Sequence, residues 1–185
     1  MTLPYGTDYF TGAFVSTLAH GLLATAAATL ASPPTVQYVH MGQPAADGCD
    51  QLVVWVDSFH LVRPRKQTAL GGGGMSEERS PLEPQGGLPA VQFNVQLLRC
   101  GAPTVSADGI QPALPTPTDL DTFGTNGLTD GWSLYRGVLA AWQSETLFGV
   151  TNPVPKHHTL LSAMKPYGPE AGVYGWLLPV KASLY

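Results

Sequence analysis

The stretch QLVVWVDSFHLV, residues 51–62, is rich in β-branched and aromatic residues and predicts a strand that is largely apolar on both faces. A second strand is predicted over Ala90–Cys100, where apolar and polar residues alternate. The apolar set is Val91, Phe93, Val95 and Leu97, and the polar set is Gln92, Asn94 and Gln96. Such alternation is typical of an antiparallel strand with one buried face. The two stretches place a β-sheet at the centre of the fold.

Residues 63–89 separate these two strands and predict a long mobile arm at the tip of a hairpin. The arm contains four consecutive glycines and, spread along its length, four prolines. Loops of this length inside a domain are usually functional or disordered. No Lys-Ser or Lys-Thr follows the glycines, so a flexible linker is favoured over a phosphate-binding loop. The candidate interface residues of the arm are Arg63, Arg65, Lys66, Gly71, Gly72, Gly73, Gly74, Glu77, Glu78 and Arg79.

The basic cluster at the start of the arm has two interpretations. Arg63, Arg65 and Lys66 form a solvated strand end, or they contact an acidic partner or the phosphates of passing DNA. The sequence alone leaves both open.

An apolar stripe predicts a first helix over residues 8–31, because large apolar residues recur every four positions. The stripe consists of Phe10, Phe14, Leu18, Leu22 and Ala26, flanked by Val15, Leu23 and Leu30. Asp8 or Thr11 is expected to cap its start. The opposite face carries small uncharged residues and predicts burial on both sides. A membrane span or a signal peptide is the less favoured alternative, because basic residues are missing at the N-terminus and His20 and two glycines interrupt the segment.

A second helix is predicted over residues 128–148, with Thr129 as its cap. Trp132, Tyr135, Leu139 and Trp142 recur at helical spacing, and this stripe is expected to pack on the sheet. The preceding residues 101–127 are rich in proline and turn signals, and they predict an irregular segment. Two further strands are predicted over residues 158–165 and 173–184, joined as a hairpin by residues 167–172.

The predicted fold is a single α+β domain over residues 1–185. Two helices pack on an antiparallel or mixed four-stranded sheet in the order α-β-β-α-β-β, with the Gly/Pro-rich arm between the first two strands.

Charged residues make up 12% of the 185-residue chain, about half of the usual share, and the net charge is −4. This balance disfavours a basic nucleic-acid-binding module and charge-driven disorder. Because the cores of protein interfaces are depleted in Lys, Glu and Asp, the scarcity of charge points to a surface covered by neighbouring molecules.

The sequence contains few candidates for chemistry. Asp57 is the one carboxylate inside an apolar run, where burial raises a carboxyl pKa as a general acid requires. The favoured alternative is that Asp57 pairs with a basic residue across the sheet or across a subunit boundary. His157 and His158 are adjacent, so in a strand they would point to opposite faces and hold no metal together. Cys49 and Cys100 are interpreted as buried reduced thiols, although a bridge at one end of the hairpin is geometrically conceivable. We therefore expect no catalytic, cofactor or metal site.

Short motifs in the second half of the chain carry a resemblance to a family. The run LRCGAP at residues 98–103, then Asp108-Gly109, Pro112 and Asp130-Gly131-Trp132 at a helix, is similar to neck proteins of phages infecting Actinobacteria. The order of the predicted elements and the long arm resemble the tail terminator proteins of long-tailed, siphovirus-type bacteriophages.

This resemblance implies a structural virion protein of the phage neck, assembled in the host cytoplasm. Such a protein forms a homo-oligomeric ring, commonly of about six subunits, that ends tail-tube polymerisation and docks the tail to the head connector. Its expected partners are the tail tube protein and the connector or adaptor proteins, with DNA passing through the lumen without specific binding and with no membrane involved. Three alternatives remain: another neck ring such as a head completion protein, a tail tube subunit, and a small hydrolase.

Overall fold

The computed structural model describes residues 12–44, 48–64, 75–77, 88–101, 116–149, 154–170 and 173–184. Two α-helices, one short 3₁₀ helix and seven strands lie within these residues. In chain order they are α1 (Gly12–Thr29), β1 (Val36–Met41), β2 (Gln51–Pro64), β3 (Met75–Glu77), β4 (Leu88–Cys100), α2 (Pro117–Gln143), η2 (Lys156–His158), β5 (Thr159–Leu161), β6 (Lys165–Glu170) and β7 (Val173–Ser183).

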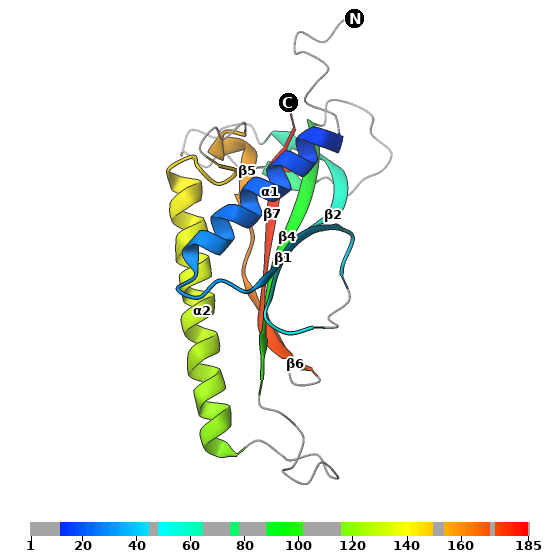
Figure 1. The fold of residues 1–185 in the computed structure, drawn as a ribbon. Helices are drawn as coiled ribbons and strands as arrows, with labels where there is room; N and C mark the ends of the chain where they lie inside the picture. Colours follow the sequence, from blue (N-terminus) through cyan, green and yellow to red (C-terminus); the bar gives the residue numbers. More distant parts are fainter. Residues whose placement is uncertain are drawn as a thin grey trace, which may run out of the picture.

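The seven strands form one mixed sheet with the order β1-β2-β4-β7-β5. β1 runs parallel to β2, and the other pairs are antiparallel. β3 pairs with β2, and β6 pairs with β7 beside β5. Figure 1 shows α1 crossing the strands obliquely while α2 runs along them. The fold is therefore α+β with both helices on one face of the sheet.

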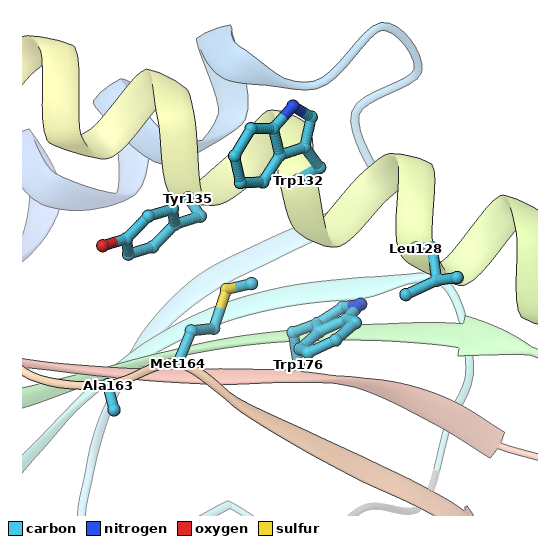
Figure 2. A pocket seen from close by; sticks show the side chains of 6 residues that line it. All are labelled: Leu128, Trp132, Tyr135, Ala163, Met164 and Trp176. Carbon is cyan, nitrogen blue, oxygen red and sulfur yellow. The ribbon is translucent and has the colours of Figure 1, made fainter.

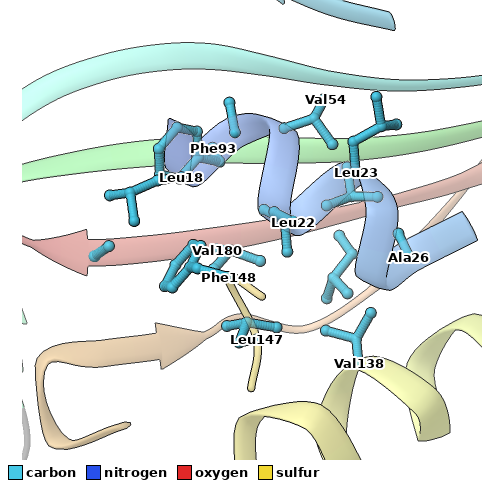
Figure 3. Close-up of a cluster of buried hydrophobic side chains, with 14 of the residues drawn as sticks. Leu18, Leu22, Leu23, Ala26, Val54, Phe93, Val138, Leu147, Phe148 and Val180 are labelled. Atoms are coloured by element: carbon cyan, nitrogen blue, oxygen red, sulfur yellow. The ribbon is translucent and has the colours of Figure 1, made fainter. Parts of the chain in front are cut away.

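The hydrophobic core lies between the helices and one face of the sheet, as Figure 3 shows. Alternate residues of each central strand point into it, and α1 contributes one face along its whole length. Fully buried core residues include Leu18 and Leu22 of α1, Leu52 and Val54 of β2, Phe93, Val95 and Leu97 of β4, Leu134 and Val138 of α2, and Leu178 and Val180 of β7. These positions confirm the inward apolar face predicted for residues 90–100. The prediction of one buried face is wrong, because Asn94 and Gln96 on the other face are also buried.

The central hairpin is confirmed, but the prediction of a four-stranded sheet is wrong. β1 was not predicted, because its residues are mostly exposed and carry no clear alternation. The strand predicted over residues 158–165 is two strands, β5 and β6, which pair with successive parts of β7 and are interrupted at residues 162–164. Its first residue, His158, lies instead in η2.

The first helix is confirmed over Gly12–Thr29. Of its predicted stripe, Leu18, Leu22 and Ala26 are buried, Phe14 is half-buried, and Phe10 lies outside the described residues. Its predicted caps, Asp8 and Thr11, lie outside the described residues. The predicted burial on both sides is not found within one chain, because His20, Ala24 and Ala28 on the outer face are exposed. By length and hydropathy, α1 is the one helix in the described part of the chain that is apolar enough to cross a membrane, and it lies near the N-terminus.

The second helix begins eleven residues before its predicted start, at Pro117. Thr116, not Thr129, is its N-cap: the Thr116 hydroxyl accepts from the Asp119 backbone N–H at 3.2 Å, and Asp119 in turn accepts from the Thr116 N–H at 3.0 Å. Thr129 lies inside the helix, and its hydroxyl donates to the Thr125 carbonyl. A capping box followed by proline at the first helical position therefore overrides the prolines and turn signals that predicted an irregular segment.

The predicted packing of the aromatic stripe on the sheet is confirmed only for its C-terminal end, where Trp142 packs against the core and its Nε1 donates to the Thr159 carbonyl of β5 at 3.3 Å. Trp132 is 61% exposed, and the face of α2 that meets β7 carries Gly127 and Gly131 instead. The rings of Tyr174 and Trp176 occupy the space in which Cβ atoms of these glycines would lie. Trp176 Nε1 donates to the Gly127 carbonyl at 2.7 Å. Because β7 supplies the large rings here, this part of the helix presents its glycines inward and Trp132 outward.

This packing predicts opposite effects for two glycines of one helix. Gly131→Ala adds a methyl group that would overlap atoms of the Trp176 ring. We therefore expect this substitution to lower the free energy of unfolding by about 1–3 kcal/mol. Gly124→Ala is the matched control, because a Cβ there meets nothing within 4 Å. It is expected to raise stability by up to about 1 kcal/mol through helix propensity. Urea unfolding followed by circular dichroism compares the two, and equal stabilisation by both would contradict the packing.

Candidate interaction surfaces

Exposed apolar side chains are concentrated on two opposite sides of the described domain. Seven large apolar residues are exposed, and six of them lie on these sides. Val36 and Met41 lie on β1 at one edge of the sheet and define the β1 side. Leu120, Leu128 and Trp132 of α2, with Leu160 of β5 at the other edge, define the α2 side. The seventh residue, Phe59, lies on β2 beyond the end of β1.

The α2 side contains an apolar groove of about 360 Å³. It is lined by Leu128, Trp132, Tyr135, Ala163, Met164 and Trp176. Figure 2 shows the Met164 side chain reaching from the β5–β6 connection towards α2, with Trp132 and Tyr135 above it and Trp176 beside it. The Trp132 and Tyr135 rings stack with centroids 6.4 Å apart, and the Arg136 guanidinium lies 5.9 Å from the Trp132 ring.

The interruption of the edge strand creates this groove. Ser162 still donates its N–H to the Pro179 carbonyl at 3.0 Å, but the next two residues make no ladder pairs with β7 before Lys165 resumes the pairing. Because Met164 makes no ladder pair with β7, its side chain lies off the sheet edge and reaches towards α2. A methionine beside aromatic rings is an adaptable surface, because its side chain is flexible and its sulfur is polarizable.

The β1 side is an open sheet edge without charge. β1 pairs with β2 on one flank only among the described strands, and its residues VQYVHM contain no ionic side chain. Met41 is 68% exposed, and Gly42 ends the strand with a positive φ of 77°. An unpaired edge of this kind invites pairing or packing with another chain.

Asp57 lies beside the end of β1, at a bulge of β2. It directly follows Val56, the partner of Met41, and the register with β4 shifts at this point. Asp57 is exposed, and its carboxylate accepts from Gln92 Nε2 and Asn94 Nδ2, each at 3.1 Å. The predicted apolar surroundings are wrong, and the partners across the sheet are the neutral amides of Gln92 and Asn94 instead of a basic residue. A basic partner across a subunit boundary stays a prediction.

A polar cluster around Arg99 joins four parts of the chain. Arg99 Nε donates to Asp130 of α2 at 2.8 Å, and Nη1 donates to Asp50 at 2.6 Å. Its Nη2 donates to the Ser32 carbonyl after α1 at 2.6 Å. The Arg99 side chain is 13% exposed, so these bonds fix the end of β4 against both helices. Arg99 and Asp130 belong to the two motifs on which the family resemblance rests, and in the structure they are in contact.

Cys49 and Cys100 form a disulfide with Cα atoms 4.8 Å apart. The prediction of two reduced thiols is therefore wrong. The ladder between β2 and β4 pairs Gln51 with Leu98, and its register continued outward by two residues sets Cys49 opposite Cys100. The bridge closes the same end of the hairpin that Arg99 ties to the helices.

Opposing effects act on the pKa values of this cluster. Burial raises the pKa of Asp50, but hydrogen bonds from Arg99 and Thr35 outweigh burial and hold it below the ordinary value of 3.8. Burial likewise lowers the pKa of Arg99, and the hydrogen bonds to Asp130 and Asp50 outweigh it, so the net pKa is raised. Both pKa shifts favour the charged forms of Asp50 and Arg99, which form an ion pair.

The lowered pKa of Asp50 predicts a loss of stability in acid. Because the folded protein binds the proton more weakly than the unfolded chain, the contribution of Asp50 is complete well above pH 3.8 and is lost as the pH falls through the folded pKa. We expect the urea midpoint to fall over this range, and Asp50→Asn to show a shallower decline. Identical pH profiles for the two proteins would contradict the role of Asp50.

The two adjacent histidines lie together rather than on opposite faces of a strand. They occupy η2, with ring centroids 4.1 Å apart, and burial and the charge of His157 lower the pKa of His158. Among the residues that the structure describes, no group of three His, Cys, Asp or Glu side chains is placed to hold a metal ion.

The predicted interface residues of the arm are only partly placed. Arg63 lies in β2, where it pairs with Ser76, and Glu77 lies in β3, where it pairs with Val62. The two ends of the predicted arm, residues 63–64 and 88–89, therefore belong to β2 and β4, and β3 lies within it. Arg65, Lys66, Gly71, Gly72, Gly73, Gly74, Glu78 and Arg79 lie outside the described residues. The α2 side and the β1 side were not among the predicted site residues; exposed Trp132 was assigned to the core because its helical spacing matches a buried stripe.

Comparison with known proteins adds no family to this picture. No protein-family model matches the chain, and a search of the curated proteins finds no match to its sequence.

Proposed function

We propose that this chain is a tail terminator of a siphovirus-type phage: a structural virion protein whose copies close into a ring at the end of the tail tube. The observation that carries the proposal is the placement of six exposed apolar side chains on two opposite, chemically different sides. A subunit in a ring needs two such sides, because each copy contacts one neighbour through one patch and the other neighbour through a different patch.

The low charge of the β1 side and of α1 supports the proposal. The sequence from Tyr9 to Ala46, which includes α1 and β1, contains no Asp, Glu, Lys or Arg. The exposed face of α1 consists of small residues and His20, and the β1 strand contains no Asp, Glu, Lys or Arg. A surface without ions is desolvated at low cost when it is covered, and interface cores show the same depletion.

The contact between Arg99 and Asp130 gives the resemblance motifs a structural role. They link β4 to α2 and thereby fix the helix that carries the α2 side. In the proposed ring these residues hold the contact surface in place and do not themselves meet the neighbour. No catalytic step is part of the proposal.

Electron microscopy of the purified full-length chain distinguishes this function from its nearest alternative. A terminator is expected to form closed rings that bind the ends of purified tail tubes and stop their growth. A tail tube subunit would instead form long polymers, and another neck ring would close but leave tube growth unaffected. Long polymers or unaffected growth would therefore contradict the terminator assignment.

The arm between β2 and β4 is proposed to contact the tail tube, the head connector or the neighbouring subunit, and its removal tests this role in joining tail to head. The β2–β4 ladder reaches Val62 and Leu88, so an Asn-Gly turn in place of residues 63–87 keeps the strand register. We expect this variant to fold with an unchanged far-ultraviolet spectrum and to form rings, but to give non-infectious particles with separate heads and tails in a complementation assay. Normal particle yield would refute the role of the arm.

A further inference from the structure

We propose that the apolar groove on the α2 side receives the β1 edge of a neighbouring copy, with Met41 as the residue that enters it. The inference rests on the proposed ring and specifies its contact. The occupant is a second copy of this chain, joined head to tail.

The register of the sheet brings the two surfaces into line. Met41 pairs with Val56, Val56 with Phe93, Phe93 with Val180, and Val180 with Leu161. Met41 therefore stands at one end of a row that ends at β5, where the chain turns towards Met164. A copy displaced along this row brings its Met41 to the groove of the next copy.

The contact has matching chemistry. Met41 is 68% exposed and unbranched, and the groove offers the rings of Trp132, Tyr135 and Trp176. Thioether sulfur beside aromatic rings is a favourable contact. Exposed Trp132 is also the residue type most often found at the energetic centre of an interface.

Charges beside the two patches have opposite signs. Asp57 lies next to the residue that pairs with Met41, and Lys165 directly follows Met164 in the groove. Both are exposed in the single chain. Seating Met41 in the groove brings the Asp57 carboxylate towards the Lys165 ammonium and selects the head-to-tail orientation over a symmetric dimer.

Site-directed cross-linking tests the contact. Within one chain, Met41 and Met164 are separated by three strands, about 19 Å across the sheet, so a short bismaleimide cannot join them inside a copy. The Met41→Cys/Met164→Cys variant is expected to give a ladder of covalent multimers that ends at the ring size. The native cysteines are bridged and do not react. Phe59→Cys/Met164→Cys is the matched control, because Phe59 is 61% exposed but lies off the row, and no ladder is expected.

Each outcome of the cross-linking experiment either supports or overturns the proposed contact. Rings without the ladder would overturn this contact and leave the ring function standing, with another protein as the occupant of the groove. Dimers from Met41→Cys alone would show a symmetric contact and overturn the inference. A chain that stays monomeric would overturn both the inference and the proposed function.

Exchange of the two charges provides an independent measurement. Asp57→Lys and Lys165→Asp are each expected to weaken assembly roughly threefold per contact at low salt, which is the size of an exposed ion pair. The double variant is expected to recover most of the loss. Effects that simply add in the double variant would contradict the pairing.

Discussion

Reduction of the Cys49–Cys100 bridge is expected to lower the free energy of unfolding by about 4 kcal/mol. The two cysteines are 51 residues apart, and a cross-link of that span removes much of the conformational freedom of the unfolded chain. The bridged loop contains β2, β3 and most of β4, so it restrains the central hairpin itself. Urea unfolding of the full chain with and without dithiothreitol measures the effect.

The control for this experiment is the Cys49→Ser/Cys100→Ser variant. Its urea midpoint is expected to match that of the reduced natural chain and to be insensitive to dithiothreitol. A natural chain whose midpoint is the same with and without reductant would show that the bridge contributes nothing to stability.

Replacement of Arg99 by methionine is expected to lower the free energy of unfolding by about 3 kcal/mol. Removing the guanidinium leaves the Asp50 and Asp130 carboxylates without their cation and the Ser32 carbonyl without its donor. The value lies at the lower end of the range for a broken buried ion pair, because the Asp50 side chain is 38% exposed and solvent screens it.

Two further variants separate the charge from the packing. Arg99→Met with Asp50→Asn and Asp130→Asn is expected to recover part of the loss, because no uncompensated carboxylate remains. Arg136→Met, which removes an exposed arginine of α2 near Trp132, is expected to cost less than about 1 kcal/mol. If Arg99→Met is no more harmful than Arg136→Met, the Arg99 cluster does not hold the fold together.

The central hairpin and α1 were predictable because burial follows their sequence patterns. Val91 to Leu97 alternate as a strand with one face in the core requires, and Leu18 and Leu22 recur at helical spacing and are fully buried. Each of these patterns reports the hydrophobic effect directly.

The remaining elements depend on contacts between distant segments. β1 is stabilised by its ladder with β2, and its own residues carry little apolar pattern. The inward face of α2 was missed because glycine carries no hydrophobic signal: Gly131 is buried because Trp176, 45 positions later, fills the space beside it. The start of α2 carried a readable signal, the capping box at Thr116 and Asp119, but the surrounding prolines and turn signals masked it.

The candidate surfaces were missed for a related reason. A spacing of three or four apolar residues predicts a buried stripe, and it gives the same signal when the stripe faces another protein. Trp132 and Met41 are distinguishable from core residues only once the neighbours within one chain are known. The low charge of the whole sequence was the sign that such surfaces exist.

Native mass spectrometry of the full-length chain tests the central claim most directly, because it counts the copies in the assembly. A single closed species of about six subunits, with no larger series, is the result that the ring predicts. A stable monomer at micromolar concentration would contradict the proposed ring, because both apolar sides would then remain exposed to water instead of being covered by neighbouring copies.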